Sequence, residues 1–236
     1  MKAIFKRELQ SYFYTAGAYV YMGVFLALGS VFFAVGNLAA RSSDLLGFLW
    51  NMSYLWLLLT PLLTMHTYAG ERKARTDQLL FTSPVSLSGI VVGKYLAGVV
   101  VLGLTVALSW IYVLIIARYG RVYPGEALCG YVGFFLQGCA FLALDMLVSA
   151  RARTPVTAAV WAFGVNLLLW LVDVLSSAVN VAFVTKVLSF ISPYQRYAPF
   201  QLGQLSYANI LYFLVFIALM LFWTVRTLDA RRWREA

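Results

Sequence analysis

The sequence predicts an all-α polytopic membrane protein with six transmembrane helices. Of its 236 residues, 62% are hydrophobic and only 11% are charged, whereas charged residues make up about 25% of a soluble domain. The mean hydropathy is +0.81. The apolar residues form long unbroken stretches, without the alternation of apolar and polar residues that is typical of membrane β-barrels. This composition excludes a soluble enzyme, a disordered chain and a disulfide-rich module.

The candidate spans are the stretches between charges, because a helix that crosses the bilayer needs about 20 consecutive apolar residues. The predicted spans cover residues 17–40, 47–69, 92–117, 127–149, 155–174 and 208–226. Residues 174–195 are also mostly apolar, but they carry Lys186 near their middle. A seventh span there would place the basic C-terminal residues outside, against the positive-inside rule. We therefore interpret 174–195 as short outer-face helices, within an outer segment of residues 174–207.

The distribution of basic residues predicts the orientation. With six spans and the N-terminus inside, 13 of the 18 Lys and Arg residues lie in cytoplasmic segments and five lie outside. Cytoplasmic segments are enriched in positive charge, so we expect a multi-pass protein of the plasma (inner) membrane with both termini in the cytoplasm. The net charge of +9 then reflects orientation and attraction to membrane lipids with anionic head groups. Nucleic acid is not an expected partner.

Residues 1–14 have the pattern of an amphipathic helix lying at the cytoplasmic membrane interface. Five apolar side chains share one helical face: Ile4, Phe5, Leu9, Tyr12 and Phe13. The basic residues lie elsewhere around the same helix. The alternative is that this segment is simply the polar start of a long first helix.

No motif in the sequence predicts a catalytic, cofactor or metal site. The sole histidine, His66, has no cluster of Cys, Asp or Glu around it that would complete a zinc site. Gly89–Lys94 resembles a phosphate-binding loop, but it has three residues between its glycines where that motif needs four, and Tyr95 follows the lysine. We therefore expect that the chain is not an enzyme and binds no cofactor itself.

Asp145 is a charged residue inside the predicted fourth span, where an ionisable group is costly unless it is paired or hydrated. Arg151 and Arg153 follow it closely, so a local ion pair is one interpretation and a gating or proton role is the other. Asn166 and Gln137 also lie within predicted spans. An interhelical hydrogen bond is their expected role, and contact with a substrate is the alternative.

The longest charged connection on the inner side is the loop of residues 70–90, between the second and third spans. Charged residues come first, apolar residues follow, and a proline stops the pattern. The charged residues are Glu71, Arg72, Lys73 and Arg75, Thr76 follows them, and the apolar residues Leu79, Leu80 and Phe81 come before Pro84. This mixture predicts a short amphipathic helix presented to a soluble partner, and a solvated turn is the alternative.

The loop belongs to a longer pattern that resembles the permease subunits of type-2 ATP-binding-cassette (ABC) exporters, closest to the gliding-motility and copper-maturation branch. The matching loop residues are Met65, Ala69, Glu71, Arg72, Thr76, Leu79, Leu80, Thr82, Pro84, Val85, Gly93 and Lys94. Elsewhere the matches are Arg7, Glu8, Leu9, Tyr12, Phe13, Gly130, Tyr131, Gly133, Ser149, Ser192, Pro193, Tyr212, Phe213, Arg231, Arg232 and Trp233. The residues that depart from the pattern are His66, Gly70, Arg75, Gln78 and Asp145.

The resemblance implies that residues 1–236 form one transmembrane permease domain. Residues 70–90 would contain a coupling helix that docks on a separate cytosolic ABC ATPase, which would bind ATP and Mg²⁺. The permease would work beside a second copy of itself or a related permease. Together they would export or extract a substrate across the plasma membrane.

A different function is compatible with the same fold. The chain would then be a membrane scaffold or mechanical transmitter, coupling ATP hydrolysis to an extracytoplasmic accessory protein without transport. The outer segment 174–207 would bind that protein, or it would only cap the spans at the interface, where aromatic side chains are favoured. An intramembrane enzyme is the least favoured function, because the sequence has no convergent set of catalytic groups.

Overall fold

The computed structural model describes residues 2–76, 86–178 and 192–235, and all regular secondary structure in these ranges is helical. The helices are α1 (Lys2–Tyr14), α2 (Gly17–Phe33), the π-helical η1 (Ala34–Ala39), α3 (Leu45–Ser53), α4 (Leu55–Thr64), α5 (Ala69–Lys73), α7 (Leu87–Leu108), α8 (Trp110–Tyr119), α9 (Pro124–Arg151), α10 (Pro155–Ala178), α12 (Pro193–Gln201) and α13 (Tyr207–Glu235). Residues 79–81 and 84 of the predicted coupling helix lie outside the described residues, as does much of the predicted outer segment.

Five of the described elements are long and apolar enough to cross a membrane: Gly17–Ala39, Leu87–Tyr119, Pro124–Arg151, Pro155–Leu175 and Tyr207–Arg232. A sixth candidate is the pair Leu45–Ser53 and Leu55–Lys73, which is bent by 48° at its break. Counting this pair as one span gives the predicted number, and each predicted range overlaps one of these elements. The third span begins at Leu87, five residues before the predicted start at 92, and Lys94, which lies in both ranges, has its charge paired inside the bundle.

The bent second span depends on a neighbouring helix for one of its backbone hydrogen bonds. Pro61 lies inside α4, and a proline has no N–H to donate to the carbonyl four residues earlier. That carbonyl belongs to Leu57, and Asn166 of α10 donates to it through Nδ2 at 3.4 Å. The side chain of Asn166 thus satisfies the carbonyl of Leu57, which would otherwise be unpaired in the apolar interior.

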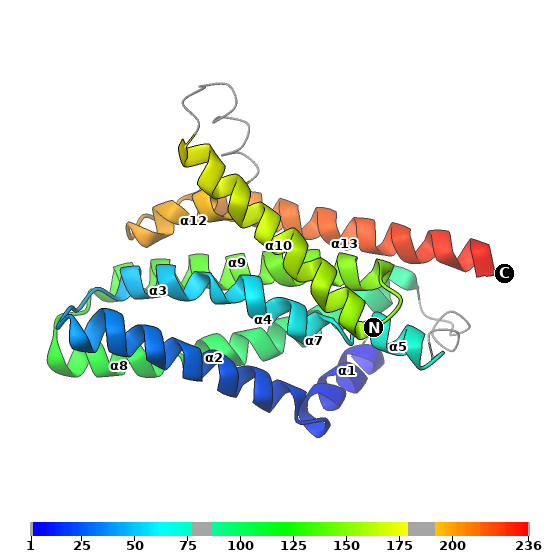
Figure 1. Cartoon of the computed structure of the whole chain (residues 1–236), viewed down its shortest axis with the longest axis horizontal. Coiled ribbons are helices and arrows are strands. Elements are labelled where there is room, and N and C mark those ends of the chain that lie inside the picture. The colour runs from blue at the N-terminus through cyan, green and yellow to red at the C-terminus, as the bar shows by residue number, and fades with distance from the viewer. Residues whose placement is uncertain (1, 77–85, 179–191, 236) are drawn as a thin grey trace.

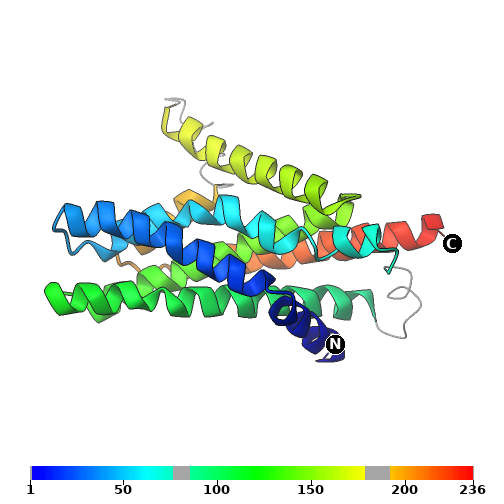
Figure 2. The same cartoon turned by 60° about the horizontal axis from the view of Figure 1, so that its bottom comes forward.

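The central helix of the bundle is α9. It packs against α3, α4, α7, α10, α12 and α13. Of the apolar stretch that could cross a membrane, 72% is buried inside the molecule in α9, whereas only 17% is buried in α10 and in α13. Figure 2 shows α10 leaning away from the other spans toward its C-terminal end. The core is therefore built around α9, and α10 is a peripheral helix.

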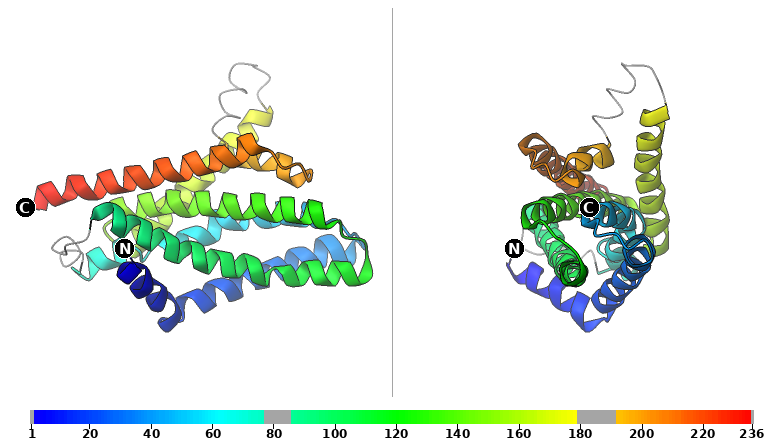
Figure 3. Two further views of the ribbon diagram at one scale, coloured as in Figure 1. Left: turned by 180° about the vertical axis from the view of Figure 1, so that it is seen from behind. Right: turned by 90° about the vertical axis from the view of Figure 1, so that its left-hand side faces the viewer.

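Both termini lie at one end of the bundle, together with α5 and the start of α7 (Figure 1). A chain that crosses a membrane an even number of times has both termini on the same side. At the same end, α1 is set at an angle to α2 (Figure 3), because Ala16 between them adopts a left-handed backbone conformation with φ of 52°. The segment is thus a separate helix, not the start of a long first span, and its position at a membrane interface stays a prediction.

Candidate functional site

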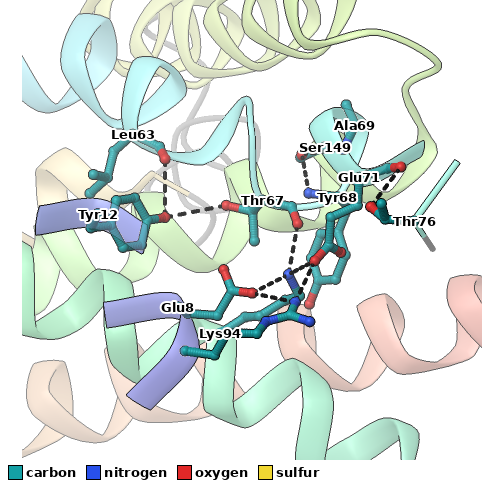
Figure 4. Close-up of polar contacts among 11 residues, drawn as sticks. Glu8, Tyr12, Leu63, Thr67, Tyr68, Ala69, Glu71, Thr76, Lys94 and Ser149 are labelled. Carbon is teal, nitrogen blue, oxygen red and sulfur yellow. Dashed lines mark hydrogen bonds and ion pairs between the residues drawn. The ribbon is translucent and has the colours of Figure 1, made fainter. Parts of the chain in front are cut away.

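Four charged side chains, Arg7, Glu8, Glu71 and Lys94, meet between α1, α5 and α7 (Figure 4). Lys94 Nζ lies 2.9 Å from Glu8 Oε1 and 2.8 Å from Glu71 Oε1. Arg7 Nη2 lies 2.9 Å and 2.8 Å from the same two oxygens. The two cations therefore alternate with the two carboxylates in a closed, electrically neutral ring. We call these four residues the ionic cluster.

Lys94 is the buried member of the ionic cluster. Its side chain is 0% exposed, whereas that of Arg7 is 57% exposed. A lysine ammonium has three N–H donors, and the third is accepted by the backbone carbonyl of Thr67 at 3.0 Å. The ammonium also lies 5.4 Å from the centre of the Tyr68 ring. The charge and every donor of Lys94 are thus satisfied within the chain, as the burial of an ion requires.

Tyr12 of α1 contacts the end of α4 and the turn between α4 and α5. The Tyr12 hydroxyl donates to the carbonyl of Leu63 at 3.2 Å and lies 3.4 Å from Thr67 Oγ1. Burial raises the pKa of Tyr12 to about 12, so the phenol remains a neutral donor at physiological pH. The carbonyl at the end of α4, which has no partner within its own helix, is satisfied in this way.

The helix α5 is also attached to the C-terminal end of α9. Ser149 Oγ accepts hydrogen bonds from the backbone N–H groups of Tyr68 and Ala69, each at 3.4 Å. Arg72 Nη1 donates to the carbonyl of Ala152 at 3.3 Å. A helix of five residues is too short to be stable by itself. Its position is therefore set by these contacts with α1, α7 and α9.

The outward side of α5 carries exposed polar residues. Lys73, Arg75 and Thr76 are exposed, and Arg72 is partly buried. Arg75 has a φ of 56°, the left-handed conformation in which helices commonly end. Of the predicted partner-facing residues that the structure describes, Glu71 alone turns inward to the ionic cluster. Leu79, Leu80, Phe81 and Pro84 lie outside the described residues.

A cavity of about 750 Å³ lies beside the ionic cluster, between α1, α2, α4 and α5. Its polar lining includes Glu8, Ser11, Thr67 and Glu71, and its apolar lining includes Val20, Val24, Leu59, Leu62 and Leu63. Because α1 and α5 both contribute walls, any displacement of α5 relative to the spans changes the shape of this cavity.

A family model described as ABC-2 family transporter protein matches residues 51–228. The chain belongs to this family. The match begins in the bent second span and ends in α13, so it includes α5, Lys94 and α9. This ABC-2 chain is therefore a multi-pass membrane permease, a transport component that is not itself catalytic. No curated protein matches it.

The structure of the permease brings together residues that the sequence pattern matched in four separate stretches. Arg7 and Glu8 come from the first helix, Glu71 from α5, Lys94 from α7 and Ser149 from α9. Sequence reasoning recognised them as matches but not as partners. The available signal was a charge placed well inside an apolar helix, which requires a counter-ion from another element.

The local ion pair that the sequence suggested for Asp145 is not formed in the structure, whereas a gating or proton role stays a prediction. It is fully buried, and Asn166 Nδ2 donates to its Oδ2 at 3.3 Å. Arg151 and Arg153 are exposed, and none of the ion pairs among the described residues joins either of them to Asp145. The interhelical hydrogen bond predicted for Asn166 is confirmed. Among the residues that the structure describes, the amide of Gln137 has no hydrogen-bond partner, so the interhelical bond predicted for Gln137 is not found there.

Proposed function

We propose that this permease is the membrane subunit of an ABC transporter driven by a separate cytosolic ATPase, and that α5 is the element on which the ATPase acts. The observation that supports this proposal is the ionic cluster. It joins α5 to α1 and α7 through buried charges, while the other side of α5 is exposed and basic. A force applied to the exposed side therefore reaches the spans through short, charge-assisted contacts.

The inward and outward residues of α5 have separate roles in this mechanism. Lys73, Arg75 and Thr76 contact the ATPase, together with the residues that follow as far as 90. Glu71 does not dock directly but transmits displacement to Lys94. A paired charge in a low-dielectric site resists separation more strongly than a solvated one. Movement of α5 consequently moves the start of α7 instead of breaking the contact.

The remaining parts of the proposal follow from family membership and from the charge distribution. The transporter contains two permease subunits, identical or related, and sits in the plasma membrane with both termini of each chain in the cytoplasm. ATP and Mg²⁺ are bound by the ATPase. The direction of transport is export or extraction from the membrane. The end of the bundle that carries α5 and the two termini faces the cytoplasm.

The test is recovery of the ATPase with the tagged permease from native membranes in a mild detergent, followed by measurement of ATP hydrolysis. Arg75→Glu reverses an exposed charge just after α5 and is expected to lower recovery of the ATPase at least several-fold. Arg118→Glu is the matched control, because Arg118 is equally exposed but belongs to α8 at the opposite end of the bundle (Figure 1).

Equal recovery of an ATPase with the wild type and both variants would contradict docking at α5. Loss of recovery with the Arg118 variant alone would place the ATPase at the other end and reverse the proposed orientation. If no ATP-hydrolysing protein accompanies the wild-type chain under conditions that preserve its fold, the proposal that a separate ATPase drives it is wrong.

A further inference from the structure

A second group of polar side chains lies inside the bundle, away from the ionic cluster. Asp145 on α9 and Asn166 on α10 are both 0% exposed. Thr60 of α4 lies beside the Asp145 carboxylate, and Tyr21 of α2 interacts with it electrostatically. Four spans therefore contribute one side chain each. We call these four residues the polar cluster.

Two buried oxygen atoms of the polar cluster have no hydrogen-bond donor. Asn166 Nδ2 donates to Asp145 Oδ2 and to the carbonyl of Leu57. Asp145 Oδ1 and Asn166 Oδ1 are both buried without a partner. The hydroxyl of Thr60 also lies against the carboxylate, but it has one proton, and it lies 2.6 Å from the carbonyl of Trp56, to which it donates. The hydroxyl of Tyr21 is likewise buried without a partner. Asp145 Oδ1 and Asn166 Oδ1 therefore each lack a donor.

No cation among the described residues supplies that donor. Tyr21 is the titratable residue on α2 that faces Asp145. On α13, the exposed Arg226 lies over the ring of Phe222 at 5.2 Å instead. On α7, Tyr95 donates to the backbone carbonyl of Cys139.

The remaining charges near these helices are bound elsewhere. Glu71 of α5 is held by Lys94 of α7, and Asp173 of α10 accepts a hydrogen bond from Ser192. An ionised carboxylate at Asp145 would thus be buried with no cation beside it among the described residues, which costs on the order of several kcal/mol.

The geometry points to a proton-binding site at Asp145, with the proton placed on Oδ1 and shared with the carbonyl oxygen of Asn166. Asn166 Nδ2 already donates to Oδ2, so a proton on Oδ1 completes a reciprocal pair between a carboxylic acid and a carboxamide. This one proton gives both orphaned oxygens a partner and removes the unpaired charge. No other ligand is needed to satisfy the pair.

The site also assigns a role to the proton, because the pair joins the peripheral α10 to the central α9. Through the bond from Asn166 to Leu57, the same amide completes the backbone of the second span at Pro61. Release of the proton would leave both oxygens without a donor and a buried unpaired charge on Asp145, and would weaken the packing of α10 against the bundle. Proton binding at Asp145 therefore holds α10 against α9 and α4, independently of whether the ATPase docks at α5.

The test is infrared difference spectroscopy of the full chain in lipid nanodiscs at neutral pH, comparing the wild type with Asp145→Asn. Asparagine is a neutral isostere of the protonated acid and is expected to preserve the fold. The wild type should show the carbonyl stretching band of a protonated carboxylic acid, and Asp145→Asn should lose that band. Asn166→Leu keeps the acid but removes its partner, so the band should shift. If Asp145→Asn does not fold, this shift alone decides the question.

Asp173→Asn is the matched control, because Asp173 is also an aspartate at a span but is only partly buried. It should change carboxylate bands and leave the acid band intact. Loss of carboxylate bands in Asp145→Asn, with no change in an acid band, would show that Asp145 is ionised and would overturn the inference. Carboxylate bands that also shift when Na⁺ replaces choline would identify a metal-cation site instead, which overturns it equally.

Discussion

Replacing Lys94 with methionine should destabilise the permease strongly, although the two side chains are similar in length. Removing one partner of a buried ion pair typically costs about 3–5 kcal/mol, because the remaining charge stays buried without compensation. The side chains of Glu8 and Glu71 are 12% and 17% exposed and keep Arg7 as a partner. The lower end of the range, about 3 kcal/mol, is therefore expected for Lys94→Met.

Arg7→Met is the matched control, since it removes the other cation of the same ring. The Arg7 side chain is 57% exposed, and exposed ion pairs contribute only about 0–1 kcal/mol. The two substitutions delete the same charge from the same two carboxylates. A difference of about 2 kcal/mol or more between them isolates the effect of burial.

The assay is reversible unfolding in mixed micelles, followed by the fluorescence of the chain's tryptophans. The double variant Lys94→Met/Glu71→Gln should recover part of the loss, because it removes a carboxylate left without its buried partner. Equal stabilities of Lys94→Met and Arg7→Met would refute the reasoning. So would a Lys94→Met variant as stable as the wild type.

Two other substitutions test the packing around α9 and α10. Gly133→Ala should destabilise the chain by about 1–3 kcal/mol, because a Cβ there would lie 2.5 Å from the Phe200 ring. Gly164→Ala is the control, because a Cβ there meets no atom within 4 Å. It should be neutral or slightly stabilising in the same unfolding assay. Asn166→Leu should lower the free energy of unfolding by about 1–3 kcal/mol. The loss should be measurably smaller in a Pro61→Ala background, because the backbone N–H of residue 61 can then reach the carbonyl that Asn166 otherwise satisfies. Equal losses in both backgrounds would contradict this role of Asn166.

The sequence predicted the helical class and the spans well, because long apolar stretches and the positions of charges decide both. It placed the start of the third span too late, at 92, since the polar residues at the start of α7, which begins at Leu87 after the N-cap Ser86, do not look like part of an apolar span. The bend in the second span was not predicted either. Pro61 was visible, but the partner that tolerates it, Asn166, comes from a helix about a hundred residues later.

The candidate site was predicted only in part. The pattern of residues 70–90 identified α5, and it also suggested that Glu71 faces a partner protein. The structure turns Glu71 inward, because Lys94 is buried beside it and needs both carboxylates. For Asp145, nearby arginines in the sequence suggested an ion pair. A helix turns those arginines toward solvent, and the actual partner comes from α10. Pairing between elements distant in sequence depends on packing, which one sequence does not encode in local patterns.

The most direct test of the central claim is site-specific crosslinking from position 76 in native membranes. Thr76 is exposed three residues after the end of α5, so a photoreactive amino acid placed there should crosslink to a cytosolic ABC ATPase identified by mass spectrometry. The same amino acid at Arg118 should not. Crosslinking of an ATPase from position 118, or of none from position 76 when the ATPase is present, would contradict the proposal that α5 receives the force of ATP hydrolysis.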